Sequence, residues 1–238
     1  MEKTTIPQHV QMPNREDNTP ITPKEQLVYV AIKRYMNKDT MEAFPSLVLI
    51  SEKTGASIPT IREAIKTLID LNYITVRKDG RKQVYKFNPY KQFEPFSYEF
   101  LDNPELTFLE KSYIIASQQY MFKSNGTGSL SYSTRELAEK INMSTATISR
   151  CNNSLQEKNF LTVVENNCKD ALTGASTETK IFHLNEFGQA VVGMLKDHED
   201  RITENTEDIN QLKKQNELMM KEIASLKKQL NPQPTIQL

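Results

Sequence analysis

The feature that most constrains this chain is an internal repeat. Residues 46–76 align with residues 133–163 without a gap, at a constant offset of 87 positions, and ten of the aligned positions are identical. A match of this length indicates one supersecondary unit that is present twice. The full length of 238 residues accommodates two such units as small domains. We therefore expect two copies of one fold.

Helix caps mark the same starting points in both copies. The first helix of each copy begins at a capping box, in which a Thr is followed three residues later by a Glu. These boxes occupy residues 22–25 and 107–110. A short second helix begins at Ser46 in the first copy and at Ser133 in the second. The caps therefore predict two successive helices in each copy.

A tight turn and a third helix follow. Gly55 and Asn142 end the second helices, because these residue types best tolerate the left-handed conformation at a helix end. Ser57 and Ser144 then cap the third helices. The helical spacing predicts the core-facing side chains of these helices, which are Ile61, Ile65 and Leu68 in the first copy and Ile148, Cys151 and Leu155 in the second.

A β-hairpin closes each copy. In the first, residues 74–76 and 84–87 are rich in β-formers, and the Lys-Asp-Gly sequence at 78–80 predicts the turn between them. In the second, residues 161–164 and 181–184 pair across a long polar loop. Three helices followed by a hairpin make up a winged helix-turn-helix.

Short stretches of both copies resemble known regulators. Residues 57–65, Ser-Ile-Pro-Thr-Ile-Arg-Glu-Ala-Ile, are similar to the third-helix signature of GntR-type regulators, although Ile58 stands where that family usually has Arg. Residues 134–160 resemble the helices of MarR- or Crp-like proteins. The tandem arrangement over residues 22–185 resembles plasmid and phage replication initiators. These resemblances imply double-stranded DNA as the partner.

In such a fold the third helix enters the major groove and the hairpin contacts the phosphate backbone. Arg and Asn are the side chains that read guanine and adenine, and hydroxyls suit phosphate contacts. The predicted DNA-binding residues are Thr60, Arg62, Glu63, Lys66 and Thr67 in the first third helix, Arg77, Lys78, Arg81 and Lys82 in the first hairpin, and Thr145, Thr147, Ser149, Arg150 and Asn153 in the second third helix.

The net charge of the chain is zero, but its charged residues are unevenly distributed between the two copies. Residues 22–90 contain 12 Lys and Arg against 7 Asp and Glu, whereas residues 104–185 contain 8 of each. The first copy is therefore expected to supply most of the sequence-independent affinity for DNA. Two alternatives to DNA binding stay open: the basic hairpin is only a solvated turn, or the winged helices bind protein.

The last fifth of the chain has a heptad pattern over residues 186–231. An Asn within an Ile- and Leu-rich seam is typical of a parallel coiled-coil dimer. A polar stretch near residues 198–205 leaves a higher oligomer open, and the alternative is a single helix lying on the body. The predicted self-association residues, which could also recruit another protein, are Leu195, Ile202, Ile209, Leu212, Asn216, Met219, Ile223, Leu226 and Leu230.

The predicted fold class is thus mainly α with small β-hairpins: two tandem winged helix-turn-helix domains followed by a long C-terminal coiled-coil helix. The domains are expected at residues 22–90 and 106–185, with a disordered tail at 1–21. A linker at 91–105 has aromatic side chains expected to pack between the domains, and a second tail occupies 232–238.

Several classes of function are excluded by what the sequence lacks. There is no Gly-rich phosphate loop, no nucleophile–base pattern and no metal-ligand spacing, so we expect no enzyme, no cofactor and no metal. Two Cys cannot form a disulfide framework, and no apolar run is long enough to span a membrane. Cys151 is expected to fill the core. We expect a cytoplasmic, nucleoid-associated protein.

The leading hypothesis is a dimeric, double-stranded DNA-binding regulator of transcription. The first alternative is a plasmid or phage replication initiator or helicase loader, whose winged helices bind origin repeats. The second alternative is a phage packaging or virion assembly protein that uses its winged helices as docking modules.

Overall fold

The computed structural model describes residues 8–14, 21–90, 92–124, 126–169, 176–186 and 209–223. The chain divides into two units, Met1–Met194 and Leu195–Leu238. Within the first unit, the two copies predicted from the repeat are called the first and second halves.

Three helices form the body of the first half, as the caps predict. They are α1 (Pro23–Lys33), α2 (Leu47–Thr54) and α3 (Ile58–Asp70). Gly55 has a φ of 75° and ends α2, which leaves only a short turn before α3. The expected inward side chains of α3, which are Ile61, Ile65 and Leu68, are all buried. The helix-turn-helix arrangement is therefore set by one left-handed residue and one apolar face.

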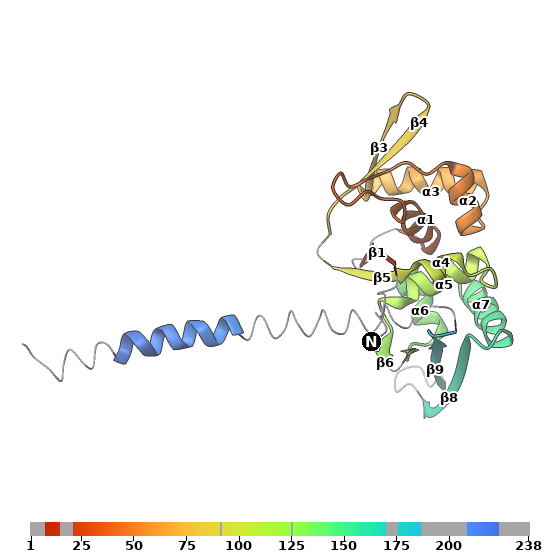
Figure 1. The fold of residues 1–238 in the computed structure, drawn as a ribbon. Helices are drawn as coiled ribbons and strands as arrows, with labels where there is room; N and C mark the ends of the chain where they lie inside the picture. Colours follow the sequence, from red (N-terminus) through yellow and green to blue (C-terminus); the bar gives the residue numbers. More distant parts are fainter. Residues whose placement is uncertain are drawn as a thin grey trace, which may run out of the picture. The chain divides into compact units, whose positions relative to one another are not determined.

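A three-stranded antiparallel sheet completes the first half, with the order β2-β4-β3. Its strands are β2 (Glu42–Ala43), β3 (Ile74–Asp79) and β4 (Lys82–Phe87). The β3–β4 hairpin projects beyond the helices of this half (Figure 1). The turn predicted at 78–80 begins two residues too early and ends one residue too early, because Asp79 still pairs with Lys82 and the turn consists of Gly80 and Arg81. Gly80, with φ 58°, supplies the positive φ that a two-residue hairpin requires.

The second half repeats this order of elements. Its helices are α5 (Phe108–Gln118), α6 (Thr134–Ile141) and α7 (Thr145–Glu157), and its strands are β6 (Phe122–Ser124), β7 (Thr127–Leu130), β8 (Leu161–Lys169) and β9 (Ser176–His183). The sheet order is β6-β7-β9-β8. Strands β7, β9 and β8 thus occupy the places that β2, β4 and β3 occupy in the first half.

The strand registers of the two halves also correspond. Ala43 pairs with Tyr85 in the first half, and its repeat equivalent Leu130 pairs with Lys180 in the second. The predicted polar loop over residues 165–180 is wrong at both ends, because β8 continues to Lys169 and β9 begins at Ser176. Polar side chains gave no strand signal there, yet Glu165 and Glu178 are paired across the ladder.

The remaining elements lie before and between the halves. They are β1 (His9–Pro13), β5 (Phe93–Ser97) and α4 (Tyr98–Asp102), and β1 pairs antiparallel with β5. The prediction of a disordered tail at 1–21 is therefore wrong for β1, and the predicted linker at 91–105 contains a strand and a helix. The pairing joins residues 80 to 88 positions apart, a separation that local sequence patterns do not report.

One hydrophobic core runs through the described part of both halves. Helix α1 packs against both α3 and α5, so the first helices of the two halves meet at the centre (Figure 1). The aromatic side chains expected between the halves include Phe96 and Phe100, which are fully buried with ring centroids 5.8 Å apart. The halves are thus joined by a continuous apolar interior.

The predicted fold class is wrong. Strands in three antiparallel sheets accompany the helices, so the protein is mixed α and β rather than mainly α with a long C-terminal coiled coil. Part of the error has a physical origin, because β1 and β5 pair across at least 80 positions and local patterns do not report such a pairing. Strands β6 and β7 were missed although they form a local hairpin, in which Ser124 pairs with Thr127 and the connecting residues 125–126 are Asn-Gly.

In the second unit, the described residues form a helix over 209–223 whose side chains are exposed. Four of the predicted self-association residues, Leu195, Ile202, Leu226 and Leu230, lie outside the described residues. Ile209, Leu212, Met219 and Ile223 are 47–58% exposed in the described helix. In the part of the chain that the structure describes, no helix is both long and apolar enough to cross a bilayer.

Candidate nucleic-acid interface

The N-terminus of α3 is ordered by hydroxyl groups. The Ser57 Oγ accepts a hydrogen bond from the Thr60 backbone N–H at 3.3 Å, and the two hydroxyl oxygens lie 2.8 Å apart. Thr67 donates its hydroxyl proton to the Glu63 carbonyl at 3.2 Å. Both predicted threonines are half-buried and already engaged within the helix. Their first role is therefore to hold the shape of the helix.

The exposed face of α3 bears charged side chains. Arg62 and Lys66 lie one turn apart and are both exposed. Neither forms an ion pair within the described residues. Glu63 is exposed on the same helix and reduces the positive potential beside Arg62. The structure thus brings together the three charged residues predicted for this helix.

Helix α7 repeats the cap of α3. The Thr147 N–H donates to the Ser144 Oγ at 3.2 Å, and the two hydroxyl oxygens lie 2.7 Å apart. The Arg150 guanidinium donates to the Thr147 Oγ1 at 3.3 Å and to the Ala146 carbonyl at 3.4 Å. Arg150 therefore lies along its own helix. The other predicted residues of α7, which are Thr145, Ser149 and Asn153, are exposed.

The basic residues of the β3–β4 hairpin fall into two groups. The Arg77 Nη2 lies 3.1 Å from the Glu42 Oε2, and its Nη1 lies 3.8 Å from the Asp79 Oδ2. Lys78, Arg81 and Lys82 are exposed and have no ion-pair partner among the described residues. Of the four predicted hairpin contacts, three are thus available to an external anion and one is held by β2.

A buried carboxylate positions α7. Glu110, on α5, is 3% exposed and accepts hydrogen bonds from the Lys158 ammonium and the Ser154 hydroxyl, each at 2.7 Å. It also accepts the Thr107 backbone N–H at 2.7 Å. Burial alone would raise the pKa of Glu110, but the bonds from Lys158, Thr107 and Ser154 outweigh it and lower that pKa. The side chain therefore ties α5 to the end of α7.

A second carboxylate connects the first half to α4. Asp102 accepts the Arg34 Nη2 and the Lys53 Nζ, each at 2.6 Å. The guanidinium of Arg34 lies over the Tyr98 ring, 4.4 Å from its centroid, and the Tyr98 hydroxyl donates to the Arg34 carbonyl at 2.9 Å. These contacts fix the C-terminal ends of α1 and α2 against the element between the halves.

Glu42, Asp102 and Glu110 were not predicted as site residues. Each acts through a partner 35 to 68 positions away, as in Arg77–Glu42 and Arg34–Asp102. The sequence signal for Glu110 was its place in a capping box, which says nothing about α7. Such pairs become visible only when the fold brings the elements together.

The second half contains the thiol of Cys151 and the imidazole of His183. Burial raises the pKa of the Cys151 thiol to about 11, so the thiolate that redox chemistry needs is scarce. His183 shares a 2.8 Å hydrogen bond with Thr162 across β8 and β9. Among the described residues, no three His, Cys, Asp or Glu side chains are grouped as metal ligands would be.

Comparison with known proteins bears on the first half. Residues 19–74 match the family model of a helix-turn-helix domain, a span that includes α1, α2 and α3. The chain therefore contains a helix-turn-helix domain, and that domain supports a role in DNA binding. No curated protein matches the chain.

Proposed function

We propose that this protein regulates transcription by binding specific duplex DNA. In the first half, α3 enters the major groove and the β3–β4 hairpin contacts the phosphate backbone. The single observation that carries the proposal is the set of exposed cations on the helix-turn-helix domain and its hairpin. Lys66 and Arg62 on α3, with Lys78, Arg81 and Lys82 on the hairpin, are exposed and have no carboxylate partner in the described residues.

The second half is proposed to contact the same DNA through α7. Support comes from two similarities between the halves. Helices α3 and α7 have the same kind of N-cap, and the strands that follow them have the same order in the sheet. The continuous core through α1 and α5 favours a fixed spacing between the halves. A fixed spacing favours a long composite site over two independent short ones.

The proposal is tested by fluorescence anisotropy of a labelled duplex titrated with protein at several salt concentrations. The triple variant Lys78→Ala, Arg81→Ala, Lys82→Ala is expected to flatten the plot of log affinity against log salt by about 0.9 for each phosphate that the hairpin no longer neutralises. The matched control removes three lysines elsewhere: Lys213→Ala, Lys214→Ala, Lys221→Ala on the exposed helix 209–223. Equal slopes for the two triple variants would refute the hairpin contact.

Selection from random duplexes tests specificity. Enrichment of one sequence, abolished in Arg62→Ala or Lys66→Ala, supports base reading by α3. No binding at low salt would reject the proposal and would favour the interpretation that the two halves are protein-docking modules.

A replication initiator is the second candidate. The observation in its favour is the repetition of one strand order in both halves, which suits a DNA site composed of direct repeats. Footprints on origin repeats, together with recovery of a replicative helicase in pull-downs, would support this role. Footprints confined to promoter regions would support the regulator.

Self-association is the last part of the proposal. Ile209, Leu212, Met219 and Ile223 recur at spacings of three, seven and four residues and are 47–58% exposed. This exposed apolar face is proposed to be covered by a second copy of the chain. Sedimentation equilibrium is expected to show a dimer that Leu212→Glu, Met219→Glu converts to a monomer; a wild-type monomer at micromolar concentration would contradict this.

A further inference from the structure

A pocket of about 650 Å³ lies beside α1, and no described residue of α3 lines it. Three segments form its walls: strand β1, the C-terminal end of α1 with the turn that follows it, and Tyr98 at the start of α4. Pockets that hold small molecules have volumes of about 300–1,000 Å³. The size therefore suits one small organic ligand.

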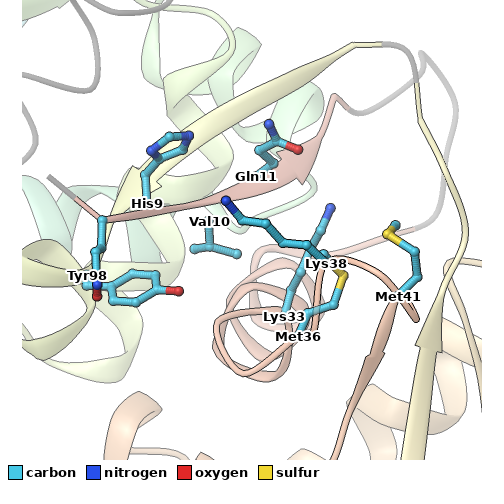
Figure 2. Close-up of a pocket in the computed structure, with 9 residues that line it drawn as sticks. His9, Val10, Gln11, Lys33, Met36, Lys38, Met41 and Tyr98 are labelled. Atoms are coloured by element: carbon cyan, nitrogen blue, oxygen red, sulfur yellow. The ribbon is translucent and has the colours of Figure 1, made fainter. Parts of the chain in front are cut away.

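The pocket lining carries positive charge. Lys33 and Lys38 both line it, and no Asp or Glu belongs to its lining among the described residues. In Figure 2 both lysine side chains extend from the α1 side of the pocket toward β1, which bears Val10 and Gln11. Two ammonium groups on one wall favour an anionic group in the space between.

Lys33 is partly buried and poorly compensated. Its Nζ donates to the Tyr29 hydroxyl at 3.3 Å and lies 5.3 Å and 5.9 Å from the ring centroids of Tyr29 and Phe87. Burial lowers the pKa of Lys33 to about 8. An anion within hydrogen-bond distance would offset the desolvation of this ammonium, which the two aromatic rings do only in part.

The rest of the lining combines apolar side chains with polar side chains at residues 8, 9 and 11. Val10, Met36 and Met41 line it together with the ring of Tyr98. Methionine side chains adapt to ligands of different shape, because they are unbranched and polarisable. The lining therefore suits a molecule with an aromatic or aliphatic body and one acidic group.

We propose that this pocket binds a small amphiphilic anion, with the carboxylate or sulfonate between Lys33 and Lys38 and the apolar body against Met36, Met41 and Tyr98. Binding joins β1 to the turn that leads into β2. The proposal concerns ligand binding by the full chain and does not depend on whether the protein binds DNA.

Two dyes test the proposal, because they share an aromatic body and differ in charge. The probe is 1-anilinonaphthalene-8-sulfonate, and its uncharged counterpart is N-phenyl-1-naphthylamine. The sulfonate is expected to bind saturably, to fluoresce more strongly when bound and to raise the thermal unfolding midpoint. The uncharged dye is expected to bind about tenfold more weakly, because it makes no charge-assisted hydrogen bond.

Lys33→Met and Lys38→Met are each expected to weaken binding of the sulfonate by about tenfold. Lys38 is exposed, so its replacement tests the pocket even if Lys33→Met does not fold. The matched control is Lys213→Met on helix 209–223, which should leave the affinity unchanged. The proposal is overturned by unchanged affinity in both pocket variants, by equal affinity for the two dyes, or by a sulfonate that lowers the unfolding midpoint.

Discussion

Arg77 and Glu42 form an ion pair across the first sheet, with 3.1 Å between Nη2 and Oε2 and 3.3 Å between Nη2 and Oε1. Strand β4 lies between their strands, so the pair spans the whole sheet. The Arg77 side chain is 56% exposed and that of Glu42 is 19% exposed. An ion pair this exposed contributes little to stability, and its main effect is to direct the guanidinium away from the end of the hairpin.

The first prediction is that Glu42→Gln strengthens binding to DNA. Removal of the carboxylate charge frees Arg77 to reach a phosphate, so the slope of log affinity against log salt should become steeper by about 0.9. Anisotropy titrations of a labelled duplex at several salt concentrations measure this. Stability should change by less than about 1 kcal/mol.

Two further variants separate this effect from a general change in charge. Glu99→Gln removes the same charge from an exposed position on α4 and should leave the slope unchanged. Arg77→Ala in the Glu42→Gln background should return the slope to the wild-type value. A steeper slope that persists without Arg77 would contradict the prediction.

The second prediction concerns the attachment of α7. Glu110→Gln leaves Lys158 without its carboxylate, so the free energy of unfolding should fall by about 2–3 kcal/mol at pH 7. Glu157→Gln, at an exposed position on α7, is the matched control and should cost less than about 0.5 kcal/mol. Urea denaturation monitored by circular dichroism measures both.

The same contact should depend on pH. The pKa of Glu110 is lowered in the folded protein, because the hydrogen bonds from Lys158, Thr107 and Ser154 outweigh burial. A lowered pKa means that the contribution is complete above the unfolded value of about 4.3 and is lost as the pH falls through the folded value. The difference between wild type and Glu110→Gln should therefore be constant near neutrality and shrink in acid. A difference that grows in acid would contradict this.

The third prediction concerns the turn of the helix-turn-helix domain. Gly55 has a φ of 75°, and an added Cβ would lie 3.7 Å from the Phe108 Cβ, which is an ordinary contact. Gly55→Ala should therefore lose about 1 kcal/mol of stability through its backbone conformation and not through a clash. Thermal unfolding followed by calorimetry measures the loss.

Gly55→Asn provides the control for this turn. Asn142 adopts a φ of 53° at the equivalent place in the second half, so Asn is compatible with the conformation. The Asn variant should be more stable than the Ala variant. If Asn were the more damaging of the two, side-chain volume and not φ would be the cause.

The sequence was most informative where the signals are local. Caps at Ser46, Ser57, Ser133 and Ser144 predicted helix starts to the residue, because an N-cap acts within one turn. The left-handed conformation of Gly55 was also predicted, because it depends on the residue type at the helix end. Strand β1 was missed because it depends on β5, whose paired residues follow 80 to 88 positions later. The local pattern in β1 is a polar–apolar alternation over residues 9–12, which is short and stands within a polar segment.

The residues of the candidate interface also differ in how far the sequence predicts them. Exposure of Arg62, Lys66 and Lys78 follows from helical or strand periodicity, which the sequence contains. The pairing of Arg77 with Glu42 follows from the sheet order β2-β4-β3, and nothing near Arg77 indicates β2. A count of cations predicts a basic hairpin, whereas the fold decides which of these cations an external phosphate can reach.

The last prediction is that Asp102→Asn loosens α4 from the first half. Asp102 accepts both Arg34 and Lys53 at 2.6 Å, but its side chain is 38% exposed, so solvent screening limits the loss of stability to about 1 kcal/mol. Hydrogen exchange should rise at the amides of α4 and stay unchanged at those of α3. Asp70→Asn, exposed at the end of α3, is the matched control and should leave both segments unchanged.

The contribution of Asp102 to stability should also depend on pH. Burial raises the pKa of Asp102, but the hydrogen bonds and charges of Arg34 and Lys53 outweigh burial, so that the net effect is a lowered pKa. The contribution is therefore complete above about pH 4 and is lost in acid. If exchange in α4 did not rise, the buried side chains of Phe100 and Leu101 alone would hold this helix, and the ion pairs would have no part in fixing the halves.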